Sequence, residues 1–224
     1  MPTSAVSPHL LQLASPSLPV GAYAYSQGLE AACERDLVPG ESGAADWILG
    51  LLVHAQQRID VPLLARFYEA HARRDEERAD HLSAWLHAMR ESRELQDEDR
   101  RIGAALARLL RDLDVPGAAR FTTHRHASYA GVFALAAAHW RIPLADTATA
   151  YVWAWLDSQV AAAIKLVPLG QTAGQRILVR AATLVPEVVE RALGYDDDEV
   201  GAATPGLAML SALHETQYSR LFRS

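Results

Sequence analysis

Lys165 is the residue whose setting points first to chemistry. It is the single lysine among 21 basic residues, and it lies in segment 151–167, which is otherwise almost uncharged. A lysine amine in apolar surroundings loses its proton more readily, and it then serves as a general base or forms a Schiff base. Such a role needs a polar pocket, and the neighbours Ala163 and Leu166 supply none. The pattern favours an ion pair with Asp157 or with another helix.

Nine histidines make a metal site the second chemistry to consider. His124 and His126 are the first candidates, because they are one residue apart near an expected helix start. The chain has no cysteine pair and no His-Glu-x-x-His motif, since His214-Glu215 continues as Thr-Gln-Tyr. We therefore expect no intrinsic metal ion.

Segment 170–175, GQTAGQ, is the one glycine-paired turn that invites comparison with a phosphate-binding loop. It lacks the Gly-Lys-Ser/Thr ending and follows an expected helix rather than a strand, so we predict no nucleotide site. Gly170 is expected to end one helix, and Gly174 to let another backbone approach closely. With no nucleophile, metal cluster or phosphate loop identified, the chain is predicted not to be an enzyme.

A helical hairpin is the element expected to position these groups. Its first helix covers residues 151–167, residues 168–170 break it, and a second helix runs back to Leu184. The first helix is apolar on nearly all sides, which is typical of a helix in the middle of a bundle. A membrane span is the alternative, but the segment is short and carries two ionisable groups.

Helical spacing of apolar residues recurs along the rest of the chain, and no segment alternates as a strand would. A new helix is expected near Pro62, and Pro186 is expected to kink its helix or to start another. The sequence predicts an all-α single domain over residues 1–224, a bundle of roughly eight to ten helices.

Residues 90–101, RESRELQDEDRR, hold nine charged side chains in twelve positions. A docking face is one interpretation of this run. Mixed charge at short spacing is more typical of an exposed helix surface with surface ion pairs, and we predict that arrangement.

Both ends of the chain carry unusual segments. Residues 15–30 form a proline- and glycine-rich loop that is expected to lead into a helix carrying Tyr25, with Tyr23 and Tyr25 facing opposite sides. The last eleven residues, HETQYSRLFRS, include Tyr218, Leu221 and Phe222, which are apolar for a chain end. They dock either on the protein's own body or on a partner, and the sequence leaves both open. Segments 1–14 and 205–224 are candidates for ordering by a partner.

The composition limits the class of protein. A net charge of −6 with scattered arginines argues against a nucleic-acid surface. One cysteine and the lack of a basic, then apolar, N-terminal region predict a reduced, cytoplasmic protein.

Three stretches together resemble the urease accessory protein UreF family: LASPSLPVGAYAYSQGLE, KLVPLGQTAGQ and HETQYSRLFRS. The segment RESRELQDEDRRIGAALARLL is similar too, and the likeness runs essentially end to end. The family often has arginine where this chain has Lys165. Carried over by motif, the implied partner-binding residues are Tyr25, Ser26, Gly28, Glu30, Lys165, Gly170, Gln171, Gln175, His214, Glu215, Tyr218, Arg220 and Phe222.

The resemblance implies an all-helical, non-catalytic assembly factor for urease. Proteins of that family dimerise and bind the accessory protein UreD (also called UreH), the GTPase UreG and the urease apoprotein, for nickel insertion. The resemblance implies no cofactor of the chain's own, because partner proteins handle nickel and GTP. An alternative is a GTPase activator or fidelity gate for UreG, with Arg220 or Arg223 near the nucleotide. A more remote one is an enzyme that uses Lys165 as a reactive amine.

Overall fold

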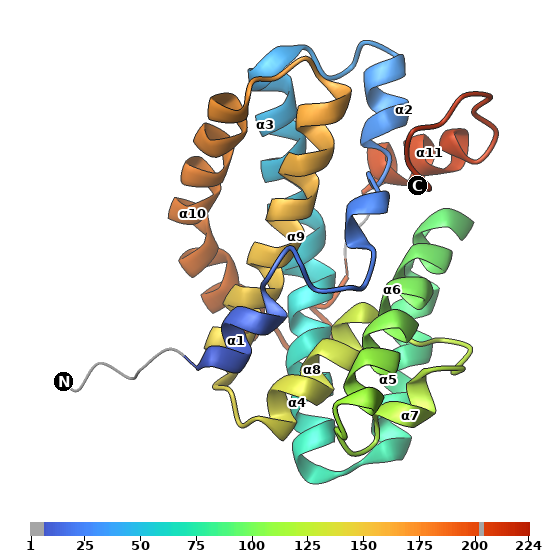
Figure 1. Ribbon diagram of the computed structural model, residues 1–224, viewed down its shortest axis with the longest axis vertical. Helices are drawn as coiled ribbons and strands as arrows, with labels where there is room; N and C mark the ends of the chain where they lie inside the picture. Colours follow the sequence, from blue (N-terminus) through green and yellow to red (C-terminus); the bar gives the residue numbers. More distant parts are fainter. Residues whose placement is uncertain (1–6, 202–203) are drawn as a thin grey trace.

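A computed structural model describes residues 7–201 and 204–224 (Figure 1). Every regular element in those two ranges is helical, which confirms the all-α prediction. The elements are α1 (Pro8–Leu13), η1 (Ala22–Ala24), α2 (Leu29–Glu34), α3 (Gly40–Leu51), η2 (Leu52–Asp60), α4 (Val61–Arg73), α5 (Glu76–Met89), α6 (Arg93–Asp112), α7 (Ala118–Phe121), α8 (Tyr129–His139), α9 (Leu144–Leu166), α10 (Gln171–Leu193) and α11 (Pro205–His214).

The predicted hairpin is the pair α9 and α10. Alanine, valine and leucine side chains bury α9 against α10, and α9 also packs on α4, α8 and the N-terminal elements. A Cβ atom on Gly174 would lie 2.6 Å from Ile164 Cδ1, so the glycine permits the close approach of the two helices. Pro186 lies inside α10 and starts no new helix. Helix α9 therefore lies inside the bundle, and α10 covers it at one edge (Figure 1).

A second long element combines α3, η2 and α4 without interruption from Gly40 to Arg73. The new helix expected near Pro62 is confirmed, because α4 begins at Val61 with Pro62 in its first turn, although it follows η2 without a break. The middle portion, η2, is π-helical over nine residues. Its wider turns place Gln56, Gln57 and Asp60 in the interior of the protein.

Residues 90–101 do not form the exposed surface that their composition predicts. Ser92 caps α6 by accepting a hydrogen bond from the backbone N–H of Leu95, and α6 then turns Glu94, Glu98 and Asp99 inward. Arg90 donates to Asp60 at 2.5 Å and to Asp99 at 3.3 Å. Buried ionised groups need such partners, so the run supplies internal polar contacts as well as surface charge.

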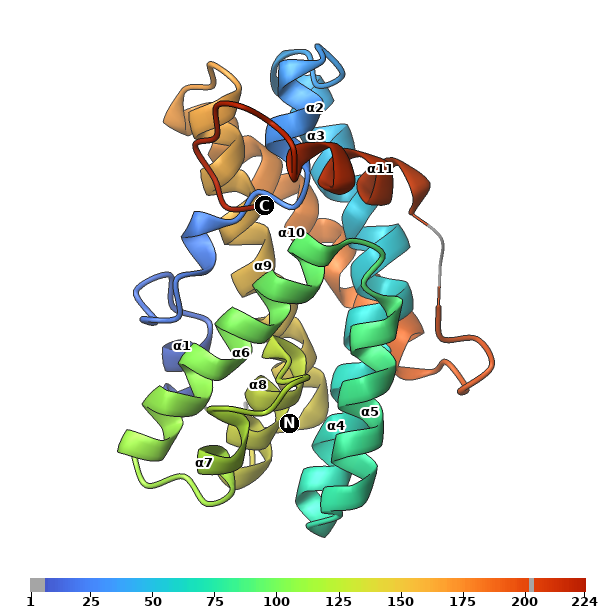
Figure 2. The same ribbon diagram turned by 90° about the vertical axis from the view of Figure 1, so that its right-hand side faces the viewer.

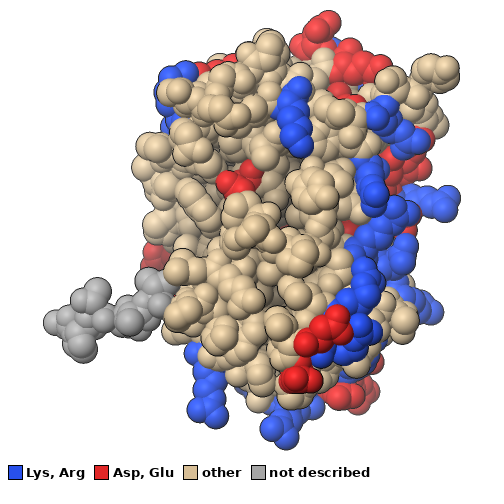
Figure 3. Space-filling view, viewed as in Figure 1, with Lys and Arg blue, Asp and Glu red and all other residues tan. Residues whose placement is uncertain are grey.

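The loop before α2 and the C-terminal tail meet at one end of the molecule. Helix α11 packs against α2 and α6, and the C-terminal residues pass between them (Figure 2). Charged side chains gather along the side formed by α5, α6 and α11, whereas the face over α9 has few (Figure 3). No helix within the described ranges is long and apolar enough to cross a membrane.

Candidate functional site

The first wall of the site is the loop that precedes α2. Gly21 and Gly28 both have φ of 76°, a left-handed conformation that glycine adopts without strain. A Cβ on Gly28 would lie 3.4 Å from the backbone nitrogen of Ser211, so this glycine also lets α11 approach. Tyr23 is exposed and Tyr25 is buried, which confirms that they face opposite sides. The helix expected to carry Tyr25 begins later, at Leu29.

Glu30 is the main anchor of the C-terminal segment. Its carboxylate accepts hydrogen bonds from the backbone N–H groups of Leu221, at 2.6 Å, and of Phe222, at 2.8 Å. Glu30 is 7% exposed. Hydrogen bonds to an ionised acceptor are stronger than neutral ones, and here they fix the backbone of the tail rather than its side chains.

His214 lies between two carboxylates and is fully buried. Its Nε2 is 3.1 Å from Glu30 and its Nδ1 is 2.8 Å from Glu94. Both ring nitrogens therefore face a carboxylate oxygen. Arg220 donates to the other oxygen of Glu94 at 3.0 Å. The four side chains form one chain of polar contacts that joins α2, α6, α11 and the tail.

A second set of contacts holds Ser224. The backbone N–H and the hydroxyl of Ser26 both donate to the backbone oxygen of Ser224, at 2.7 and 2.6 Å. The Ser224 hydroxyl donates to Glu98, and the Gln27 amide donates to the other Glu98 oxygen at 2.8 Å. Burial raises the pKa of Glu98 to about 7, although the hydrogen bonds from Ser224 and Gln27 act in the opposite direction. We call Ser26, Glu30, Glu94, Glu98 and His214 the tail clasp.

The tail shows two faces. Phe222 is buried, with the ammonium of Lys165 lying 5.6 Å from its ring centroid. Tyr218 and Leu221 face solvent. The described tail therefore docks on the protein's own body and still presents apolar side chains outward.

Lys165 does not form the predicted ion pair. It has no carboxylate partner within the described residues, and Asp157 lies two turns away along α9. The side chain is exposed and contributes a cation–π contact to Phe222. An exposed amine lacks the apolar surroundings on which the Schiff-base hypothesis depends.

The structure brings the first and third motifs together and leaves most of the second motif apart. Glu215 joins the clasp region by accepting from the backbone N–H of Arg93 at 3.1 Å. Gly170, Gln171 and Gln175 are exposed at the α9–α10 connection, at the same end of the molecule as α2 (Figure 1). Lys165 links that hairpin to the tail through its contact with Phe222.

The candidate metal ligands lie elsewhere. The ring centroids of His124 and His126 are 6.3 Å apart, and the ring of His126 lies tilted against that of His87, with their centroids 4.2 Å apart. Across residues 7–201 and 204–224, no group of three or more His, Cys, Asp or Glu side chains is placed to hold a metal ion.

The UreF family model matches residues 38–182. The chain belongs to the UreF family. A urease accessory protein UreF of Alkalilimnicola ehrlichii is 52% identical over 215 residues, covering 96% of this chain and 94% of that protein. UreF 2 of Brucella anthropi is 47% identical over 216 residues, with 96% and 95% covered. The UreF of Chromohalobacter salexigens is 45% identical over 232 residues, with both chains fully covered.

Two residues of the tail clasp, and their partners Gln27 and Ser224, could not be predicted from the sequence of this UreF family member. Glu94 and Glu98 lie four residues apart in the charged run, a spacing that places both on one helix face. Gln27 and Ser224 carry no signal beyond belonging to the end motifs. The pairing partners are 71 to 198 residues distant along the chain, which no local pattern reveals.

Proposed function

We propose that the protein is a non-catalytic scaffold for urease maturation, whose tail clasp and outward-facing tail form the docking surface for the accessory protein UreD. In this account it also recruits the GTPase UreG to the urease apoprotein, so that nickel is inserted into the metallocentre. The chain acts as a homodimer in the cytoplasm. It has no cofactor of its own, because nickel and GTP stay with its partners.

The observation that carries the proposal is the two-faced tail. Backbone contacts to Glu30 and Ser26 hold the segment on the body, which leaves its outward side chains free for another protein. The relative solvent-accessible surface is 105% for Tyr218 and 65% for Leu221. Met209 and Leu213 of α11 add exposed apolar surface beside them. Exposed apolar groups gathered in one region are typical of protein-binding surfaces.

Co-expression with UreD and UreG followed by gel filtration tests the proposal. We expect the wild-type chain to co-elute with both. The double variant Tyr218→Ser/Leu221→Ser should fold normally and lose UreD. The control is Val179→Ser, which removes a similarly exposed apolar side chain from α10 and should leave the complex intact. Co-elution of the double variant at wild-type yield would contradict the proposal.

The second candidate is direct regulation of the UreG GTPase by an arginine. Arg223 is exposed, its side chain has no ion-pair partner in the described parts of the chain, and its backbone N–H donates to Ala24. Arg220 is held by Glu94. An arginine finger raises GTP turnover by about 10³–10⁵. UreG turnover measured with wild-type, Arg223→Ala and Arg220→Ala chains separates activation from recruitment, because recruitment alone leaves turnover unchanged in all three.

A further inference from the structure

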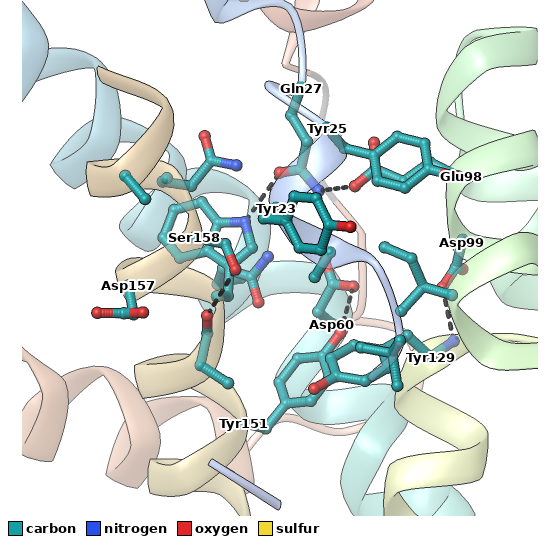
Figure 4. A pocket seen from close by; sticks show the side chains of 18 of the residues that line it. Tyr23, Tyr25, Gln27, Asp60, Glu98, Asp99, Tyr129, Tyr151, Asp157 and Ser158 are labelled. Carbon is teal, nitrogen blue, oxygen red and sulfur yellow. Dashed lines mark hydrogen bonds between the residues drawn. The ribbon is translucent and has the colours of Figure 1, made fainter. Parts of the chain in front are cut away.

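A cavity lies next to the tail clasp, between the N-terminal loop, η2, α6 and α9 (Figure 4). Its volume is about 170 Å³. This is roughly ten times the ~15 Å³ that a single water molecule requires, so the space admits a ligand of several non-hydrogen atoms. Tyr23, on the N-terminal loop, is exposed and lines the cavity.

Two buried amide groups in the cavity wall have an unpartnered oxygen. Gln56 and Gln159 are 4% and 2% exposed, and the Oε1 atom of each has no hydrogen-bond donor within the described residues. An unsatisfied buried acceptor costs about 1–3 kcal/mol. Gln56 belongs to the π-helical element η2, and π-helical turns frequently occur at functional sites. The two acceptors call for a ligand that donates hydrogen bonds.

The charge of the wall is negative. Four carboxyl groups line the cavity, and Arg90 is the one basic side chain among its described lining residues. Arg90 is already paired with Asp60 and Asp99. Neither Asp157 nor Glu98 forms an ion pair among the described residues, and burial raises the pKa of both carboxyl groups, although Arg90 lowers that of Glu98. A bound cation would supply the positive partner.

Aromatic rings complete the wall. Tyr23, Tyr25, Tyr129, Tyr151 and Trp155 all line the cavity, and Figure 4 shows the four tyrosines around it. Faces of such rings attract organic cations by about 0.5–2 kcal/mol each. A bare metal ion suits the site less well, because the described residues hold no group of three ligating side chains.

We propose that this cavity binds a small organic cation with several N–H donors, of the guanidinium or alkylammonium class. The donors satisfy the oxygens of Gln56 and Gln159, the charge is balanced by Asp157 and Glu98, and the tyrosine rings cover the carbon atoms. The cation site does not rest on the proposed docking function, although Glu98 belongs both to the cavity wall and to the tail clasp.

The test uses N-methylguanidinium and its neutral isostere N-methylurea, titrated into the full-length protein at constant ionic strength. The readout is the indole N–H resonance of Trp155, which donates to Gln27 at 2.8 Å beside the cavity. The exposed Trp153 on the same helix serves as the internal reference. We expect a saturable shift of the Trp155 resonance with methylguanidinium and none with methylurea.

Variants identify the groups responsible. Asp157→Asn should weaken methylguanidinium binding about tenfold, since it removes one charge at close range. Gln159→Leu, which fills similar volume without the acceptor, should weaken it as well. Asp146→Asn, an exposed change in the first turn of α9, should not. Equal binding of methylurea, no saturable shift, or equal weakening by Asp146→Asn would each overturn the proposal. These results do not depend on UreD or UreG.

Discussion

The α9–α10 hairpin and the C-terminal tail are held in place by opposite means. Apolar side chains and the close approach at Gly174 hold the hairpin, and this packing is spread over many residues. Directional hydrogen bonds to Glu30, Ser26 and Glu98 hold the tail, with Phe222 as its single buried aromatic ring. Because the apolar contacts of the hairpin are spread over many residues, they are lost only when the whole protein unfolds. A few polar anchors permit local release, which suits a segment that a partner must reach.

The largest loss of stability is expected from a substitution inside the hairpin. Leu156 in α9 is fully buried, so Leu156→Ala should lower the free energy of unfolding by about 2–5 kcal/mol. The volume-conserving Leu156→Met should cost less than about 1.5 kcal/mol. Urea unfolding followed by circular dichroism measures both. Tail anchoring in the native state should be unchanged, and a Leu156→Ala chain whose tail is released while α9 stays intact would contradict the comparison.

A smaller and local effect is expected at the clasp. Glu30→Gln removes the charge that accepts from Leu221 and Phe222, and loss of such bonds costs about 1–3 kcal/mol. Trypsin should then cleave faster after Arg220 and Arg223, while the melting temperature changes little. The control is Glu34→Gln, an exposed change at the end of α2. Cleavage at the wild-type rate would show that Glu30 does not anchor the tail.

The pH dependence of stability tests one polar anchor of the tail, Glu98. Because its pKa is raised from 4.5 to about 7, the folded chain binds this proton more tightly than the unfolded chain. The proton on Glu98 therefore contributes stability at low pH, and this contribution is lost as pH rises from about 4.5 to about 7.

Glu98→Gln should reduce that decline, as measured by urea unfolding midpoints from pH 5 to pH 8. Asp97→Asn, its surface neighbour paired with Arg100, is the control and should keep the wild-type pH dependence. If the stability of Glu98→Gln declined with pH as much as that of the wild-type chain, Glu98 would not be the cause of the decline.

The smallest effect belongs to Ser26. Ser26→Ala removes one donor to Ser224, but the backbone N–H of residue 26 still donates to the same oxygen. We expect a loss of about 1 kcal/mol in tail anchoring, seen as a modest rise in trypsin cleavage. Ser26→Thr keeps the hydroxyl and tests whether the loss comes from the hydrogen bond. A rise as large as in Glu30→Gln would mean that the two anchors are not separate.

Sequence reasoning predicted the hairpin well, because its information is local. Apolar spacing over residues 151–184 and the break at Pro168 are enough to place two antiparallel helices. The prediction for residues 90–101 was wrong, because their charged composition indicated an exposed helix surface, whereas several of these side chains are buried. The side chains that make Glu94 and Glu98 internal, His214 and Ser224, are more than a hundred residues distant. The ion pair predicted for Lys165 was wrong for a similar reason, because its side chain contacts the ring of Phe222, which is distant along the chain.

Native-state hydrogen exchange of the unmodified chain tests the central claim most directly. Amides of Leu221 and Phe222 should exchange by local opening, at a rate that stays constant as urea is added below the unfolding transition. Amides in the middle of α9 should exchange only through global unfolding, at a rate that rises with urea. If tail and hairpin amides show the same urea dependence, the tail is not a separately releasable element.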